Sequence, residues 1–171
     1  MRSKQYVAAL RPVDGRLMLS TLHATDAPSA AMRLVDMEVE PYLVAAALDC
    51  VLAQRLARKL CVSCCEMYNP SSDELLRNRV SPDVMAASDG MAFYRKKGCP
   101  RCSQTGYKGR IGIYQLLLMS EEVETLAVKR STREEIETKA KEQGMRSLWD
   151  DGLAKVVSGV TALEELGRVL A

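Results

Sequence analysis

The chain has 171 residues, of which 47% are apolar and 5% aromatic, and its formal net charge is +2. That length favours one domain, or one domain with an insertion, around a mainly aliphatic core. The near-neutral charge gives no global sign of a nucleic-acid or acidic partner. No apolar run reaches the roughly 20 residues of a membrane span, and the N-terminus lacks the apolar segment of a signal peptide. We therefore expect a cytoplasmic, reducing location.

The chain opens with two short stretches, 1–15 and 17–23. In the first, Pro12 and Gly15 would end any helix that begins earlier, so its structure stays open. The second, LMLSTLH, is short, apolar and bounded by turn signals. These features predict a buried strand that ends at His23, the only histidine of the chain.

Two helices are expected next. Asp26 is a favourable N-cap, and Pro28 suits the first turn of a helix that continues to about residue 37. The apolar face of that helix is predicted to contain Ala27, Ala31, Leu34 and Val35. Pro41 begins a second helix that runs to about residue 49. Cys50 follows in an apolar run and is predicted to be a small core residue, because free cysteine is often buried.

Two Cys-x-x-Cys pairs, Cys61/Cys64 and Cys99/Cys102, lie at the ends of a polar stretch that is rich in turn residues. In a reducing location, paired cysteines indicate a metal more often than a disulfide. Two such pairs complete the tetrahedral set of four sulfurs that zinc prefers. Four thiolates leave no position open to water, so the site is predicted to be structural. The adjacent Cys65 is either a spare thiol or a substitute ligand.

The segments on each side of this stretch favour strands to different degrees. VLAQRLARKL at 51–60 fits both helical spacing and a strand with one apolar side, so periodicity leaves its structure open. RIGIYQLLLM at 110–119 is rich in β-forming residues and predicts a strand. If both are strands, they can pair antiparallel, with the cysteine stretch as an enlarged hairpin connection.

The C-terminal third has a helical pattern throughout. Ser120 caps one helix, and Thr132 begins a capping box for the next, which ends at Gly144. A third helix, which stops at Gly159, contains the strongest apolar stripe of the chain, and Trp149 is expected to be its most buried residue. The stripe consists of Met145, Leu148, Trp149, Leu153, Val156 and Val157. A last helix follows.

With these elements in place, the sequence resembles the C-terminal part of the type II secretion and type IV pilus assembly ATPases. The resemblance covers about residues 15–171. It is carried by GRLMLSTLHATDAPSAAMRLVDM, EPYLVAAALDCVLAQRLARKLC, GCPRCSQTGYKGRIGIYQLLLM and EQGMRSLWDDGLAKVVSGVTALEEL. It implies an α/β fold that is a partial RecA-like P-loop ATPase core with an inserted four-cysteine zinc-binding loop and a helical C-terminal subdomain. It also makes 51–59 a core strand.

The resemblance implies a division of the chain and a set of site residues. The expected parts are the C-terminal portion of the core at 1–60, the zinc-binding insertion at 61–102, the returning core strand at 103–119 and the helical subdomain at 120–171. The implied zinc ligands are Cys61, Cys64, Cys99 and Cys102. The resemblance also implies that His23 lies near the nucleotide.

The family implies a homo-hexameric motor that uses ATP and Mg²⁺ to move an inner-membrane platform protein, at the cytoplasmic side of that membrane. This sequence has no Gly-x-x-x-x-Gly-Lys-Ser/Thr loop, whose amides and lysine hold the phosphates. The acidic strand that positions Mg²⁺ is also missing. We therefore expect no tight ATP binding and no hydrolysis by this chain alone. The alternative is a non-catalytic, zinc-stabilised adaptor that docks on the platform protein.

A basic run at Arg95, Lys96 and Lys97 has Arg101, Lys108 and Arg110 nearby. Such a run is usually a solvated face. The sharper hypothesis is contact with the platform protein or with anionic lipid head groups, where each basic residue contributes about 1 kcal/mol. A nucleic-acid-binding zinc ribbon is the weakest interpretation, because basic and aromatic residues are not interleaved.

Overall fold

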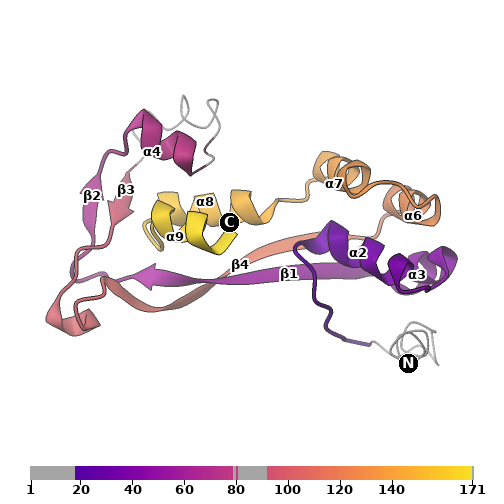
Figure 1. Ribbon diagram of the computed structural model, residues 1–171, viewed down its shortest axis with the longest axis horizontal. Coiled ribbons are helices and arrows are strands. Elements are labelled where there is room, and N and C mark those ends of the chain that lie inside the picture. The colour runs from indigo at the N-terminus through magenta and orange to yellow at the C-terminus, as the bar shows by residue number, and fades with distance from the viewer. Residues whose placement is uncertain (1–17, 79, 81–91, 171) are drawn as a thin grey trace. The chain divides into compact units, whose positions relative to one another are not determined.

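A computed structural model describes residues 18–78, 80 and 92–170, so the open question about residues 1–15 lies outside the described residues. Helices and strands are mixed along the chain, which confirms the α/β class (Figure 1). The elements are α2 (Ala27–Asp36), α3 (Pro41–Ala47), β1 (Cys50–Leu60), β2 (Glu66–Tyr68), α4 (Ser72–Arg77), β3 (Phe93–Arg95), the 3₁₀ turn η1 (Pro100–Cys102), β4 (Tyr107–Leu118), α6 (Glu121–Val128), α7 (Arg133–Glu142), α8 (Leu148–Val157) and α9 (Leu163–Leu170).

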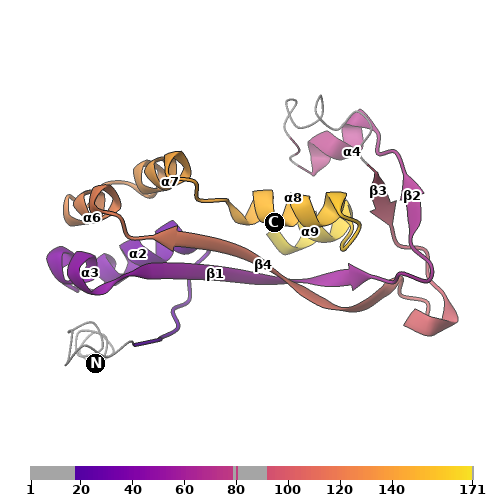
Figure 2. The ribbon, with the colours of Figure 1, turned by 180° about the vertical axis from the view of Figure 1, so that it is seen from behind.

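Two compact units divide the chain, and each is assembled from separate stretches of sequence. One unit contains residues 1–53 and 115–147, and the other contains residues 54–114 and 148–171. The long strands β1 and β4 contribute to both units and pair with each other. Their arrows point in opposite directions (Figure 2), as the sequence predicts for an enlarged hairpin.

The expected strand at 17–23 is wrong for residues 18–23, which have no regular secondary structure. Met18 is 54% exposed and Leu19 is 89% exposed, so the stretch is not a core element. A strand requires a neighbouring strand to satisfy its N–H and C=O groups. Within the described residues, only β1, β4, β2 and β3 pair, and none of them pairs with this stretch.

The helices of the first unit begin where the sequence predicts. The Asp26 carboxylate accepts a hydrogen bond from the Ser29 N–H at 2.8 Å and caps α2, and Pro28 lies in the first turn. The predicted apolar face is buried. The Ser120 hydroxyl caps α6, and the capping box that begins at Thr132 is formed in α7. The core of this unit contains Ala27, Ala31, Leu117, Val123, Ile136 and Ala140.

β1 resolves the ambiguity at 51–60 in favour of a strand, Cys50–Leu60. The prediction that Cys50 is a core residue is wrong, because its side chain is exposed. Successive side chains of a strand point to opposite faces. Cys50 therefore shares the exposed side of β1 with Leu52, which is 58% exposed.

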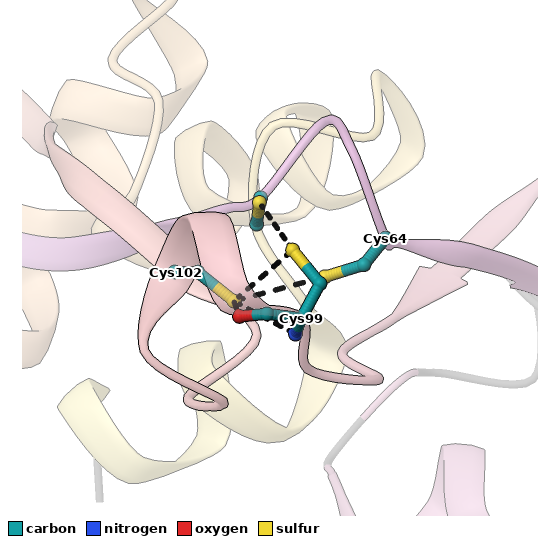
Figure 3. A group of neighbouring side chains, drawn as sticks. Cys64, Cys99 and Cys102 are labelled. Atoms are coloured by element: carbon teal, nitrogen blue, oxygen red, sulfur yellow. Dashed lines mark hydrogen bonds between the residues drawn. The ribbon is translucent and has the colours of Figure 1, made fainter.

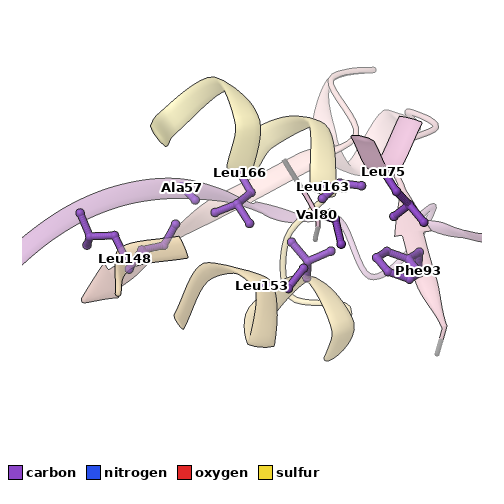
Figure 4. Close-up of a cluster of buried hydrophobic side chains, with 10 residues drawn as sticks. Ala57, Leu75, Val80, Phe93, Leu148, Leu153, Leu163 and Leu166 are labelled. Carbon is purple, nitrogen blue, oxygen red and sulfur yellow. The ribbon is translucent and has the colours of Figure 1, made fainter. Parts of the chain in front are cut away.

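The second unit has its core around α8 and α9 (Figure 4). The cluster consists of Ala57, Leu75, Val80, Phe93, Ile113, Leu148, Leu153, Val156, Leu163 and Leu166. Three of these residues, Leu75, Val80 and Phe93, come from the stretch between the cysteine pairs. The described residues of that stretch therefore share the core that the two C-terminal helices provide.

Trp149 is only partly buried, so the prediction that it is the most buried residue of its helix is wrong. The buried residues of α8 are Leu148, Gly152, Leu153 and Val156, and Trp149 packs against the same core cluster as a partly buried side chain. Gly152 permits close packing, since a Cβ atom there would lie 2.2 Å from the Cδ1 atom of Leu166.

Candidate metal centre

The first cysteine pair follows directly from the end of β1. The Cys61 N–H donates to the Gly106 carbonyl at 2.9 Å, which connects the two ends of the cysteine stretch through their backbones. The Cys64 and Cys65 N–H groups both donate to the Cys61 carbonyl, at 3.1 and 2.9 Å. This tight turn brings the side chains of the first pair to one side of the chain.

The second pair is arranged around η1. Cys99 precedes the turn, and Cys102 is its last residue. The Cys102 Sγ atom accepts hydrogen bonds from the N–H groups of Cys99 and Gly106, each at 3.2 Å. Backbone N–H donors of this kind stabilise a thiolate over a thiol. The chain leaves the turn through left-handed backbone at Ser103 and Gln104, with φ of 52° and 62°.

The four cysteine sulfurs lie within 4.8 Å of one another (Figure 3). The Sγ–Sγ distance is 3.9 Å for Cys61 and Cys99, 3.8 Å for Cys64 and Cys102, and 3.7 Å for Cys99 and Cys102. Disulfide sulfurs lie about 2.05 Å apart, so none of these pairs is bonded. A tetrahedral set of sulfurs about 2.3 Å from a zinc ion has Sγ–Sγ edges of about 3.8 Å. The observed spacing therefore fits a four-sulfur metal site.

The surroundings of two thiols are electrostatically different. Burial opposes ionisation of Cys102, but the N–H donors of Cys99 and Gly106 outweigh burial and lower the pKa of this thiol to about 6. Burial, together with the neighbouring thiols of the set, raises the pKa of Cys64 to about 12. A cation that binds the cluster would favour the thiolate form of each sulfur.

Cys65 lies outside the four-sulfur set. Its side chain packs with Leu60, Tyr107 and Ala162 and is partly buried. This position favours a spare thiol over a substitute ligand.

The basic run expected to face solvent is exposed but has acidic neighbours. Lys97 and Arg95 both pair with Glu66, at 2.5 and 3.8 Å. Lys96 pairs with Glu164 at 2.8 Å. These ion pairs reduce the local positive charge that an anionic surface would meet.

His23 belongs to the other unit, in the irregular stretch before α2, and its side chain is exposed. Two contacts fix the end of this stretch. The Ala27 N–H donates to the buried Gln115 side chain at 3.0 Å. The Arg133 guanidinium donates to Asp26 at 2.7 and 3.0 Å. Sequence reasoning missed both anchors, because neither pairing is marked by a motif or by spacing.

A family model described as "Type II/IV secretion system protein" matches residues 6–168 of the chain. The chain belongs to this family. The chain is 40% identical over 163 residues to the type II secretion system protein HxcR of Pseudomonas aeruginosa. The match covers 95% of this chain and 30% of HxcR. It is 39% identical over 160 residues to the type IV pilus assembly ATPase PilB of Thermus thermophilus, which covers 94% of this chain and 18% of PilB.

A third relative is the type II secretion system ATPase E of Vibrio cholerae, which is 39% identical over 171 residues. The match covers 95% of this chain and 31% of the Vibrio protein. The secretion-family chain thus spans between 18% and 31% of the length of these three relatives. In its described part, no helix combines the length and the apolar character that crossing a membrane requires.

Proposed function

We propose that this chain is the metal-bearing C-terminal part of a motor ATPase that powers type II secretion or type IV pilus extension. The family match over residues 6–168 carries the proposal. It is supported by 39% identity to two relatives that are named as ATPases, PilB and ATPase E. We assign residues 1–60 and 103–119 to a partial RecA-like core, residues 61–102 to the metal-binding insertion and residues 120–171 to the helical subdomain.

We further propose that the phosphate-binding loop is supplied from outside these 171 residues, since they contain no Gly-Lys-Ser/Thr. In the assembled motor, His23 lies near the nucleotide, six copies form a ring, and the ring acts on an inner-membrane platform protein from the cytoplasm. Contact with anionic lipid is a weaker part of the proposal and would use the exposed residues Lys108 and Arg110 of β4.

The four cysteines are proposed to hold one structural zinc ion. The support is the all-sulfur set and its Sγ–Sγ spacing of 3.7 to 3.9 Å. Zinc bound by four thiolates has no open coordination position for a substrate. The ion would instead join the end of β1 to the turn before β4, and its binding energy would contribute to folding.

A chimera tests the motor proposal. This chain replaces the matching 163-residue region of HxcR, and ATP hydrolysis is measured for the chimera and for its His23→Ala variant. We expect turnover by the chimera and a lower kcat for the variant. A folded, zinc-loaded chimera that hydrolyses no ATP but binds the platform protein would contradict the motor proposal and support the adaptor alternative.

A further inference from the structure

A buried carboxylate of α9 contacts β1, the strand that leads into the candidate metal centre. Glu165 of α9 is 0% exposed. Its oxygens accept hydrogen bonds from Arg58 through the backbone N–H, Nε and Nη2, at 3.0, 3.0 and 2.6 Å. Arg168 donates through Nε and Nη2 at 2.8 and 2.6 Å. Burial raises the pKa of Glu165, but the hydrogen bonds from Arg168 and Arg58 outweigh it and lower the pKa to about 2. The carboxylate is therefore ionised at neutral pH.

The segment between α8 and α9 also holds the end of β1, through hydrogen bonds to the backbone of β1. The Thr161 hydroxyl donates to the Arg58 carbonyl at 2.9 Å, and the Leu60 N–H donates to the Val160 carbonyl at 2.9 Å. Leu60 is followed directly by the ligand Cys61. The connection between α8 and α9 thus fixes the strand just before the first cysteine pair.

Arg58 also contacts the segment that follows the second cysteine pair. Its guanidinium lies 4.2 Å from the centroid of the Tyr107 ring, a distance at which a cation is attracted to the ring face. The Tyr107 side chain is buried and packs with Leu60 and Ala162. Glu165 holds Arg58 in place on this ring, because Arg58 donates two side-chain hydrogen bonds to the carboxylate.

Tyr107 directly follows the residue that contacts both cysteine pairs. The Gly106 N–H donates to the Cys102 Sγ atom, and the Gly106 carbonyl accepts from the Cys61 N–H. A displacement of the Tyr107 ring would therefore move Gly106 and two ligands. A continuous path of contacts leads from Glu165 through Arg58 to the metal-binding sulfurs.

We propose that Glu165 is a positioning residue for the metal centre. It holds Arg58 against Tyr107, and so keeps the Gly106 N–H directed at the Cys102 thiolate. Loss of the Glu165 charge will speed metal release although all four ligands remain. The inference rests on the proposed zinc site. Residues that orient metal ligands typically change metal affinity by about 10- to 100-fold when they are replaced.

If Glu165 only stabilised the fold, its replacement would speed metal release no more than the replacement of another carboxylate that joins a helix to a strand. Asp151 offers this matched control. Asp151 is a partly buried carboxylate of α8 that accepts from the Tyr114 N–H of β4 at 2.8 Å and pairs with Lys155. It therefore also connects a C-terminal helix to a strand of the same unit. Neither Tyr114 nor Lys155 adjoins any of the four cysteines in the sequence. Replacement of Asp151 should affect stability without a comparable effect on metal release.

The experiment measures zinc transfer from the full, zinc-loaded chain to the chelator 4-(2-pyridylazo)resorcinol. Circular dichroism establishes that each variant is folded. We expect Glu165→Gln to release zinc about 10- to 100-fold faster than wild type, and Asp151→Asn to release it at nearly the wild-type rate. The absorption spectrum of the Co²⁺-loaded protein should change for Glu165→Gln alone, because it reports the geometry of the four sulfurs.

Variants of Tyr107 and Arg58 keep the proposal testable if Glu165→Gln does not fold. Tyr107→Phe keeps the ring, and the Tyr107 hydroxyl has no hydrogen-bond partner among the described residues, so its release rate should match wild type. Tyr107→Leu and Arg58→Lys remove the stacked contact and should speed release.

Equal release rates for folded Glu165→Gln and Asp151→Asn would overturn the inference. Wild-type protein that retains no zinc would instead refute the proposed metal site, and the inference with it.

Discussion

The Sγ atoms of Cys61 and Cys99 lie 3.9 Å apart, although 38 positions separate the two residues along the chain. Closing a loop of that length costs conformational entropy, and the buried residues Leu75, Val80 and Phe93 of the cysteine stretch pack in the core of α8 and α9. Backbone contact between Cys61 and Gly106 and packing on α8 and α9 hold the ends together. A shared metal ion would add a third constraint at the same point.

Cys64 of the first pair and the adjacent Cys65 give a direct test of the ligand set. Cys64→Ser should reduce bound zinc from one ion per chain to a small fraction, because three sulfurs hold zinc less tightly than four. Cys65→Ser should retain one zinc, since Cys65 packs outside the set. Mass-spectrometric metal analysis of both purified variants checks this. Zinc loss from both variants, or from neither, would contradict the assigned ligands.

Zinc removal should loosen one part of the chain more than the rest. After treatment with a chelator under reducing conditions, hydrogen exchange at residues 61–68 and 93–106 should accelerate, because the metal no longer ties the two cysteine pairs together. Exchange in α6 and α7 should change little, as these helices belong to the other unit. Uniform acceleration over all peptides would mean that the metal supports the whole fold.

Both the backbone conformation at position 106 and the close packing around it require glycine. Its φ is +75°, and a Cβ atom there would lie 2.5 Å from the Cβ atom of Lys96. Gly109 has a similar φ of +82°, but its Cβ atom would only touch the Lys59 side chain at 3.9 Å. Gly109→Ala should cost about 1–2 kcal/mol for the left-handed backbone alone.

Gly106→Ala should cost more than Gly109→Ala, because the clash with Lys96 adds to the same backbone strain. It should also speed zinc release, since the Gly106 N–H contacts Cys102. Denaturant unfolding gives the free energies for both variants. Equal costs at the two glycines would show that the close approach to Lys96 is relieved without penalty.

The ion pair of Asp26 with Arg133 makes the start of α2 sensitive to acid. Burial raises the pKa of Asp26, but hydrogen bonds from Arg133 and Ser29 hold the pKa below its ordinary value of 3.8. A carboxyl whose folded-state pKa is depressed stabilises the fold fully above its unfolded pKa, and the contribution disappears as the pH falls through the folded value. The stabilisation should therefore be constant near neutral pH and be lost below about pH 4.

Asp26→Asn isolates this charge, because asparagine is also a good N-cap. We expect a loss of about 1 kcal/mol at pH 7, measured by urea unfolding, and a smaller difference from wild type at pH 3. Arg133→Met should show non-additive coupling with Asp26→Asn in a double-mutant cycle. A difference between wild type and Asp26→Asn that stays the same at both pH values would exclude an electrostatic origin.

Local sequence signals predicted the helices and the cysteine cluster well. The caps at Asp26, Ser120 and Thr132 lie where the sequence placed them, because capping depends on residues within one turn. The Cys-x-x-Cys spacing similarly predicted the four-sulfur set. For 51–60, periodicity fitted both helix and strand, and the family resemblance correctly favoured the strand.

Features that depend on distant partners were predicted poorly. The strand expected at 17–23 was an inference from composition, but strand formation depends on a neighbour that short-range patterns do not specify. Trp149 was chosen for its size and apolar stripe, but its side chain is only partly buried against the core cluster. The Glu165 cluster was missed because an acidic residue on an amphipathic helix ordinarily indicates exposure. Only the placement of Arg58 and Arg168 makes its burial favourable.

Native mass spectrometry of the purified chain, with zinc quantified and ATP added, tests the central claim most directly. We predict one zinc per chain and no retained nucleotide, because the sequence supplies four clustered sulfurs but no phosphate-binding loop. Chains without zinc would contradict the metal centre. Oligomers that retain ATP would reveal a nucleotide site within these residues and contradict the proposed division of the motor.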